Sequence, residues 1–347
     1  MTSTSSRLHN VDAAVLARHA DYQNALAALP GASVIHLAGS NHSRTRAIVT
    51  LLHANEPSGF KAIHRLIQER IVPRTDIEVI VASVDAAKEP PRLSRRHLPS
   101  EEDLNRCFSP PYNTPQRQLA SAILHHLGTL KPEVVIDTHN TSSHSAPFCV
   151  ARHSDPVTRS WSTMFSPRMV VLQTGLGTLL EQPIGDSPVI TVEFGSWMDP
   201  SVDDIAFDAL HRLFTIDTPP TSPSRGDEPL ISLHQPRRLL LREGARLSYG
   251  AGLVISDQRP QLTLINSIDQ CNFKRLPPGT VLGWCTSEKL PIVLNPKDET
   301  VETYLTVSGS TVTTAVPLML FMATTDAAIA AEDCIAYLVP KEDIETF

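Results

Sequence analysis

His53 and Glu56 stand three positions apart in the segment HANEP, directly after the apolar run AIVTLL (47–52). Pro57 follows, and proline is favoured at the first position of a helix, so the segment predicts a strand-to-helix turn. A histidine and a carboxylate held three positions apart on such a turn can converge on one metal ion. Taken alone the match is common, and a loop histidine beside a helix-capping glutamate explains it more often.

Two further polar residues lie at the ends of apolar, strand-like segments. His139 ends EVVIDTH (133–139), and Glu193 lies near the end of PVITVEFG (188–195). In open α/β sheets, ligands bind beyond the carboxyl ends of the strands. Singly, a buried hydrogen-bonded histidine and a capping glutamate are equally good explanations. Several such residues at one edge favour a binding site.

Two imidazoles and one carboxylate favour zinc over hard cations, which prefer oxygen ligands. Three protein ligands with one open position are the arrangement of a catalytic zinc. Glu193 is then a separate carboxylate that can take a proton from the attacking water and deliver it to a leaving nitrogen. Asp137, two residues before His139, can orient its imidazole, although a solvated aspartate at a strand end fits equally well.

A third feature is the segment DLNR, in a polar loop at residues 103–106. An adjacent asparagine and arginine, here Asn105 and Arg106, can hold a carboxylate through an amide hydrogen bond and a bidentate guanidinium. By itself this is ordinary surface sequence.

The order of these motifs resembles the succinylglutamate desuccinylase/aspartoacylase family, within the wider group of zinc carboxypeptidase-like hydrolases. The matching stretches are HANEPSG (53–59), DLNRCF (103–108), VVIDTHNTS (134–142) and ITVEFG (190–195). The resemblance covers residues 30–216. It is specific for the fold and the zinc site, and much less so for the substrate.

The resemblance implies a role for each matching residue. Zinc is expected on His53, Glu56 and His139, general acid/base catalysis on Glu193, and substrate carboxylate binding on Asn105 and Arg106. The family also places an arginine shortly before the Asn–Arg pair, where it polarises the scissile carbonyl. Arg95 and Arg96 stand ten and nine residues before Asn105, slightly further than usual. We favour Arg96, although the segment also reads as a solvated basic loop.

The elements that must position these residues predict an α/β fold. Before residue 30 the apolar spacing is helical. From there to residue 216, short β-branched segments (32–38, 47–52, 77–84, 133–139, 168–174 and 188–195) alternate with helical patterns (57–70, 115–130, 155–165 and 201–214). Nearly continuous apolar strands are typical of a sheet buried on both faces. We therefore expect a mostly parallel sheet flanked by helices over residues 1–216.

A change of character follows this region. Residues 217–229, DTPPTSPSRGDEP, are rich in proline, serine and charge, as in a linker. Residues 230–347 then contain strand-like segments separated by Gly, Pro and Asp turns, with little helical pattern. They predict a smaller β-rich C-terminal domain.

The composition argues against some classes of function. Thirty Lys and Arg against 37 Asp and Glu give a net charge of −7, which argues against a nucleic-acid partner. The five dispersed cysteines include no CxxC pair and fit a reducing compartment. There is no apolar leader and no run long enough to cross a membrane, so we expect a cytoplasmic protein. The segment GLGTLL (175–180) lacks the third glycine of a dinucleotide site.

These features predict a zinc-dependent amidohydrolase that cleaves the amide of an N-acyl amino acid or similar small carboxylate. A zinc carboxypeptidase acting on peptides is the alternative among enzymes, because it uses the same metal and Asn–Arg chemistry. An inert metal- or carboxylate-binding protein on the same scaffold is the alternative outside them. The sequence leaves the acyl group, the amino acid and the oligomeric state open.

One departure from the family concerns the substrate side chain. Aspartoacylase-type members carry a second anion-binding arginine about ten residues before the catalytic glutamate. Here position 183 is proline, and no Arg or Lys occurs between Arg168 and Glu193. Burying a second carboxylate without a cationic partner is costly. We therefore expect a substrate with one carboxylate, unless Arg152, Arg159 or Arg168 folds back to supply the charge.

Overall fold

The computed structural model describes residues 7–172, 175–219, 224–225, 228–253, 260–296 and 299–347. They form two compact units. The first contains the residues up to Asn140, residues Pro147–Leu230 and Phe347; the second contains Thr141–Ala146 and Ile231–Thr346. The short piece Thr141–Ala146, which follows His139 by two residues, is a part of the second unit that the sequence does not indicate.

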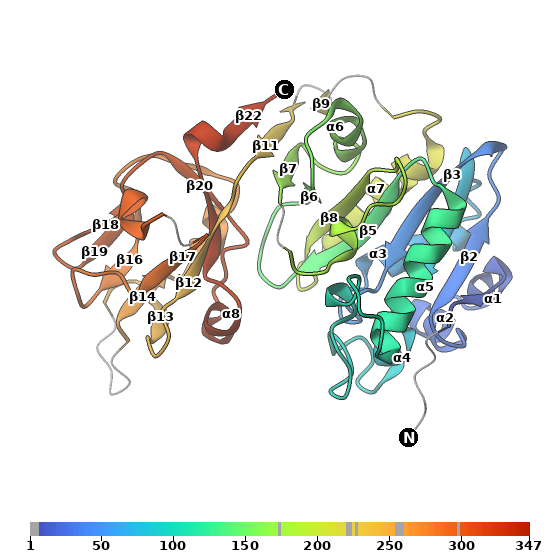
Figure 1. Ribbon diagram of the computed structural model, residues 1–347, viewed down its shortest axis with the longest axis horizontal. Helices are drawn as coiled ribbons and strands as arrows, with labels where there is room; N and C mark the ends of the chain where they lie inside the picture. Colours follow the sequence, from blue (N-terminus) through green and yellow to red (C-terminus); the bar gives the residue numbers. More distant parts are fainter. Residues whose placement is uncertain (1–6, 173–174, 220–223, 226–227, 254–259, 297–298) are drawn as a thin grey trace. The chain divides into compact units, whose positions relative to one another are not determined.

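The first unit is built on a large mixed sheet (Figure 1). Its strands lie in the order β1 (His9–Asn10), β2 (Ser33–Leu37), β4 (Thr75–Val81), β3 (Asn41–Thr50), β5 (Val135–Thr141), β8 (Val189–Ser196), β6 (Phe148–Ala151) and β7 (Arg168–Val171). Strand β3 pairs in parallel with β4 and β5, and β6 pairs in parallel with β7. The pairs β2–β4 and β6–β8 are antiparallel.

Helices cover both faces of this sheet (Figure 1). One core contains α1 (Ala13–Ala17), α2 (Tyr22–Ala27), α3 (Ser58–Gln68), α6 (Pro156–Ser162) and α7 (Val202–Thr215), and the other contains α5 (Pro115–Leu130). Helix α4 spans Val84–Lys88. Successive strand residues alternate between the two cores: Ile48 packs in the first, and Ala47 and Val49 in the second. This alternation explains why the strands are continuously apolar.

Two local features differ from the sequence expectation. The helical region before residue 30 is two short helices, because Asp12 and Asp21 each accept a hydrogen bond from the first turn of a separate helix. Strand β6 was not anticipated, since a four-residue segment carries little periodic signal. Residues 173–174 of the expected strand 168–174 lie outside the described residues.

The second unit is β-rich and has its own core. One sheet has the order β15 (Arg275–Leu276), β20 (Leu318–Phe321), β21 (Ala336–Pro340), β12 (Arg237–Leu241) and β17 (Ile292–Asn295). The other has the order β13 (Leu247–Gly250), β14 (Leu262–Ile265), β16 (Val281–Cys285), β19 (Thr311–Thr314) and β18 (Leu305–Ser308). Strand β11 (Ile231–Leu233) pairs with β22 (Ile344–Thr346), and helix α8 spans Ala327–Glu332.

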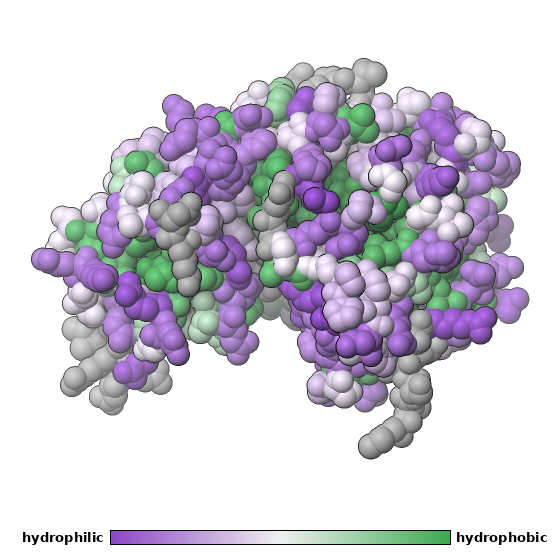
Figure 2. Space-filling model, viewed as in Figure 1, coloured by the Kyte–Doolittle hydropathy of each residue, from purple (hydrophilic) through white to green (hydrophobic). Residues whose placement is uncertain are grey.

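Within the expected linker, β9 (Ser224–Arg225) pairs with β10 (Glu228–Pro229), while residues 220–223 and 226–227 lie outside the described residues. Hydrophilic side chains occupy much of the face seen in Figure 2. Among the described residues, no helix is both long and apolar enough to span a membrane.

Candidate metal centre and active site

The turn after β3 carries His53 and Glu56 to the carboxyl edge of the sheet. The chain leaves β3 at Thr50, and the amide of Glu56 donates to the His53 carbonyl oxygen over 3.1 Å, which closes the turn before α3 begins at Ser58. Gly59 lets α3 start close to β5, because a Cβ at this position would lie 2.1 Å from Oγ1 of Thr138. The tight turn and the close helix therefore bring the first motif against the strand that carries His139.

Three ligand-type side chains converge at this edge. Nδ1 of His53 lies 2.9 Å from Oε1 of Glu56, and Nδ1 of His139 lies 2.7 Å from Oε2. The two Nδ1 atoms are 3.1 Å apart. All three side chains are buried. Among the described residues this is the one group of three or more His, Cys, Asp or Glu whose donor atoms are close enough to hold a metal ion together.

A carboxylate stands behind each imidazole. Nε2 of His139 lies 3.0 Å from Oδ2 of Asp137, and Nε2 of His53 lies 3.2 Å from Oδ1 of Asp103. A carboxylate behind Nε2 favours the tautomer with the proton on Nε2 and the lone pair on Nδ1. The Nδ1 lone pairs of both histidines and the carboxylate of Glu56 then face one point, and none of these atoms carries a hydrogen. Such a set of ligand atoms fits a divalent cation.

The charges at the centre are strongly perturbed. Burial raises the pKa of Glu56, but the histidines outweigh it and hold the pKa well below its usual range. Burial lowers the pKa of His139, but the carboxylates of Asp137 and Glu56 raise it well above the usual value. The pKa of Asp103 is also well below its usual range, because His53 and Arg96 outweigh its burial. The lowered pKa values mean that Glu56 and Asp103 remain carboxylates, the form that binds a cation or holds an imidazole N–H.

Asn140 locks the elements around the centre together. Its backbone N–H donates to Oε2 of Glu56 over 3.2 Å, and its side-chain Oδ1 accepts from the backbone N–H of Ser58 over 3.2 Å. Its Nδ2 donates to the carbonyl oxygen of Gly195 over 3.1 Å. Asn140 thus joins the ends of β5 and β8 to the start of α3. His139 and Glu193 lie on these two strands, and Glu56 lies just before this helix.

Glu193 lies on β8, opposite Phe148 of β6. Its Oε2 is buried and has no hydrogen-bond partner among the described residues. Burial raises the pKa of Glu193 to about 7; His139 and Arg96 oppose the rise, and the charges of Glu56 and Asp137 add to it. Strand β8 is the neighbour of β5, which carries His139, so Glu193 lies on the strand next to that of this ligand-type residue. A carboxyl with a pKa near neutrality is suited to both accepting and donating a proton.

Arg96, rather than Arg95, faces the centre. Nε of Arg96 donates to Oδ2 of Asp103 over 2.9 Å, and its Nη1 lies 3.5 Å from Oε1 of Glu56. The Arg96 carbonyl oxygen also accepts from the amide of Ala54 over 2.9 Å. The basic loop is therefore attached to the turn that carries His53, whereas Arg95 is solvent-exposed.

Asn105 and Arg106 lie on the same rim, in the short helix η1 (Leu104–Arg106). Asn105 is buried, and its Oδ1 accepts a hydrogen bond from the amide of Leu179 over 3.1 Å. Arg106 is exposed and bonds the Asn105 carbonyl oxygen. Burial raises the pKa of Asp103, but His53 and the charges of Arg96 and Arg106 lower it by more. The Asn–Arg pair is thus linked to the cluster through Asp103.

Sequence reasoning missed two members of this arrangement. It named Asp103 only as part of DLNR and did not place it behind His53, and it gave Asn140 no role. The available signal was their position: each directly adjoins or lies within a matched motif. The sequence around Asp103 does not reveal that this residue contacts His53, which lies fifty positions earlier in the chain.

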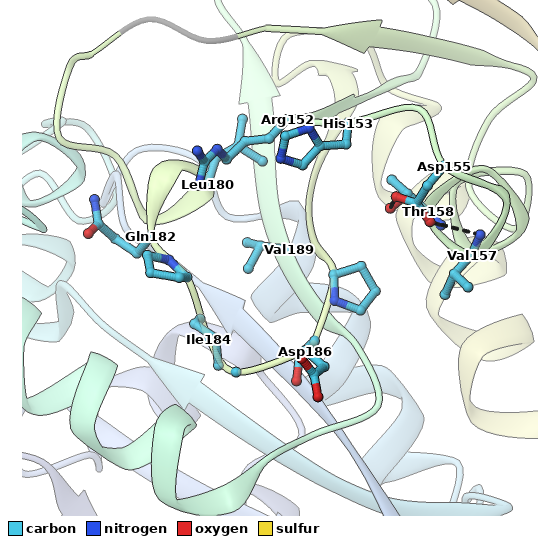
Figure 3. A pocket seen from close by; sticks show the side chains of 14 residues that line it. Arg152, His153, Asp155, Val157, Thr158, Leu180, Gln182, Ile184, Asp186 and Val189 are labelled. Carbon is cyan, nitrogen blue, oxygen red and sulfur yellow. Dashed lines mark hydrogen bonds between the residues drawn. The ribbon is translucent and has the colours of Figure 1, made fainter.

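A separate cavity of about 400 Å³ lies at the amino end of β8, where Val189 lines it (Figure 3). It is lined by Arg152, Asp155, Pro183 and Asp186, among others, and by none of the predicted catalytic residues. Nη1 of Arg152 donates to the carbonyl oxygen of Glu181. Because Glu193 stands four residues further along β8, this cavity is about 13 Å away along the strand and is not the candidate active site.

The fold and the cluster define an α/β protein with a candidate metal centre at the carboxyl edge of its central sheet. Residues 43–206 match the succinylglutamate desuccinylase/aspartoacylase catalytic domain. This match confirms the resemblance to the family that the order of the motifs indicated. No curated protein matches the sequence.

Several solved structures have a similar fold over most of the chain. A succinylglutamate desuccinylase/aspartoacylase from Rhodobacter sphaeroides is 16% identical, with a TM-score of 0.54, covering 90% of this chain and 87% of that one. A putative family protein from Shewanella amazonensis SB2B is 14% identical, with a TM-score of 0.59, covering 90% and 94%. The product-bound ectoine utilization protein EutE (DoeB) from Ruegeria pomeroyi is 14% identical, with a TM-score of 0.52, covering 90% and 86%. At these identities the likeness shows the fold.

Proposed function

We propose that this protein is a zinc-dependent hydrolase that cleaves the amide bond of an N-acyl amino acid or a similar small carboxylate. The observation that carries the proposal is the convergence of His53, Glu56 and His139 at the edge of the sheet, with Glu193 on β8, the strand next to β5. The match of residues 43–206 to a family of deacylases supports the reaction type.

Zinc is the metal that the donor set favours. His53 and His139 each offer Nδ1, and Glu56 offers a carboxylate, while Asp103 and Asp137 support the imidazoles from behind. Mixed nitrogen and oxygen ligands of this kind suit zinc better than calcium or magnesium. When bound, zinc supplies a Lewis acid that polarises the scissile carbonyl and lowers the pKa of a bound water.

Glu193 is the proposed proton carrier. Its carboxylate takes a proton from the attacking water and, once protonated, delivers it to the departing amine nitrogen. Burial raises its pKa to about 7, and its buried Oε2 has no competing hydrogen-bond partner among the described residues. Both properties favour proton transfer in either direction near neutral pH.

Arg96 is proposed to stabilise the negative charge that develops on the carbonyl oxygen. Its guanidinium lies at the cluster, 3.5 Å from Glu56, and is held through Nε by Asp103. A fixed cation of this kind lowers the energy of a tetrahedral oxyanion more than that of the neutral carbonyl. Asn105 and Arg106 are proposed to hold the substrate carboxylate, as a donor pair on the same rim.

The substrate side chain is proposed to be neutral or cationic. Pro183 occupies the position at which aspartoacylase-type members are expected to carry their second arginine. Two arginines that could replace it are engaged elsewhere: Arg152 bonds the Glu181 carbonyl oxygen, and Arg159 bonds that of Ser154 and packs over the Phe347 ring. This engagement favours a substrate with a single carboxylate.

The test is a panel of N-acyl amino acids supplied to the zinc-loaded protein, with release of free amine as the readout. Dipeptides and longer peptides are run alongside. Turnover of acyl amino acids with little cleavage of peptides is the expected result. The reverse preference would support the carboxypeptidase alternative, and bound zinc without turnover of any compound would support an inert binding protein.

A further inference from the structure

The carboxylate of Glu181 binds several backbone amides of the loop 175–180, which contacts the Asn–Arg motif. Glu181 ends the short helix η2 (Leu179–Glu181), and its carboxylate oxygens accept from four successive backbone amides. The donors are Gly175, Leu176, Gly177 and Thr178. Successive amides that converge on one anion form a rigid concave turn. The glycine-containing segment 175–180 is thus a loop folded around its own glutamate.

The same loop is pressed against the Asn–Arg motif. The carbonyl oxygen of Gly177 accepts from the amide of Phe108 over 2.9 Å. Gly177 has φ +72°, and a Cβ on it would lie 3.0 Å from the carbonyl oxygen of Arg106. A side chain at this position would therefore be strained and would push the loop away from the motif.

The contact that matters for binding lies one residue beyond this anchored segment. The amide of Leu179 donates to Oδ1 of Asn105, and both residues are buried. This bond fixes which end of the Asn105 amide is the acceptor and which is the donor. Nδ2 has no hydrogen-bond partner among the described residues, so it is the end left to bind another group.

We propose that Glu181 is a positioning residue for substrate binding. By holding four amides of the loop it sets the Leu179 amide, which in turn orients the Asn105 side chain so that Nδ2 is presented to the substrate carboxylate. The inference rests on the proposed function, in which Asn105 binds that carboxylate. Arg152, on the chain after β6, also donates a hydrogen bond from Nη1 to the Glu181 carbonyl oxygen.

The first test compares Glu181→Ala and Glu181→Gln. Because Asn105 holds the substrate before and during reaction alike, its loss of orientation raises KM and leaves kcat nearly unchanged. We expect KM to rise by roughly 10-fold in the alanine variant, the effect of one hydrogen bond to a charged group. Glutamine retains one acceptor oxygen and should recover part of the loss. Asp186→Ala, which removes an exposed acid from the turn between η2 and β8, is the control and should leave KM unchanged.

The second test isolates the Leu179 amide. Thr178 has φ −79° and ψ 162°, a conformation suited to a residue before proline, and Leu179 is the first residue of η2, where proline is tolerated. Leu179→Pro therefore removes the N–H donor in a compatible backbone. Leu179→Ala loses the same buried side chain but keeps the donor. A higher KM in the proline variant than in the alanine variant is the expected result.

Amide hydrogen exchange separates this inference from the proposed function. In Glu181→Ala we expect faster exchange at residues 175–179, and the Asp186→Ala control should exchange like the wild type. If the wild type turns over substrate but Glu181→Ala keeps its KM, the positioning role is wrong and the proposed function stands. If the wild type is inactive on the whole panel, the proposed function fails. Unchanged exchange at Leu179 in Glu181→Ala would then overturn the positioning role as well.

Discussion

The Nδ1 atoms of His53 and His139 lie 3.1 Å apart, although 86 residues separate them along the chain. Each imidazole has a carboxylate near its other nitrogen, so the two lone pairs point at each other and at Glu56. Such a pair is stable only when a proton or a cation lies between the nitrogens. The distance is therefore the most specific sign of a metal centre in this fold.

Removing either histidine should abolish tight metal binding. We expect one zinc per wild-type chain, and a decrease of at least roughly 10-fold in His53→Ala and in His139→Ala. His64→Ala is a matched control, because His64 is also buried but bonds the carbonyl oxygen of His19. Elemental analysis after extensive dialysis measures the zinc content. Full zinc content in either ligand variant would remove that histidine from the assignment.

The carboxylates behind the imidazoles should affect affinity without being ligands. Asp137→Asn and Asp103→Asn keep the size of the side chain but weaken the hold on the Nε2 proton. We expect zinc affinity to fall by about 10- to 100-fold in each, as is usual when such supporting groups are lost. Competition with a chelator of known affinity measures the change. Wild-type affinity in both variants would contradict the proposed role of these carboxylates.

Glu193→Gln should separate chemistry from metal binding. The amide retains the size of the carboxyl group but cannot accept a proton, so kcat should fall by on the order of 10² or more. Zinc content should stay near that of the wild type. Asp186→Asn, in the turn that precedes β8, neutralises a neighbouring acid and serves as the control. Near-normal turnover in Glu193→Gln would exclude this residue as the proton carrier.

A carboxylate with two histidine partners, outside the candidate active site, should make the stability of the fold sensitive to acid. Oε2 of Glu78 on β4 lies 3.0 Å from Nδ1 of His36 on β2, and Oε1 lies 3.1 Å from Nε2 of His126 on α5. Burial raises the pKa of Glu78, but the two histidines outweigh it and the net pKa is lowered. A carboxyl with a lowered folded-state pKa stabilises the fold above its unfolded-state pKa and loses this effect as pH falls through the folded-state value.

Glu78→Gln should therefore destabilise the protein by about 1 kcal/mol at neutral pH, the scale of a partly buried hydrogen bond. The difference from the wild type should shrink as the solution is acidified. Urea unfolding at several pH values measures it. A difference that is constant with pH would show that the charge of Glu78 does not contribute.

Substrate choice follows from the missing arginine near Pro183. We expect kcat/KM for N-acetylaspartate to be lower than for N-acetyl derivatives of neutral or basic amino acids, because a second carboxylate has no assigned cationic partner. Side-by-side kinetics with the zinc-loaded protein measure the ratio. A clear preference for the aspartate compound would show that another cation supplies the charge.

Much of this centre could be predicted from the sequence because its residues lie where strands end. His53, His139 and Glu193 each follow an apolar segment, and the carboxyl ends of neighbouring parallel strands meet at one edge of a sheet. The interactions within loops could not be predicted. Asp103 behind His53 and Leu179 beside Asn105 join segments 50 and 74 residues apart, and their contact depends on loop conformations that leave no periodic signal. Strand β6 could not be predicted for a similar reason, because a run of four apolar residues is compatible with a strand, a helix or a loop.

The central claim is that one zinc ion, held by His53, Glu56 and His139, is required for amide cleavage. The most direct test is to remove all metal with a chelator, add zinc back in steps and follow the initial rate of amine release from the best acyl amino acid. The account predicts no activity without metal and a linear rise that ends at about one zinc per chain, with no such rise in His139→Ala. Full activity in the metal-free protein, or recovery in the variant, would contradict it.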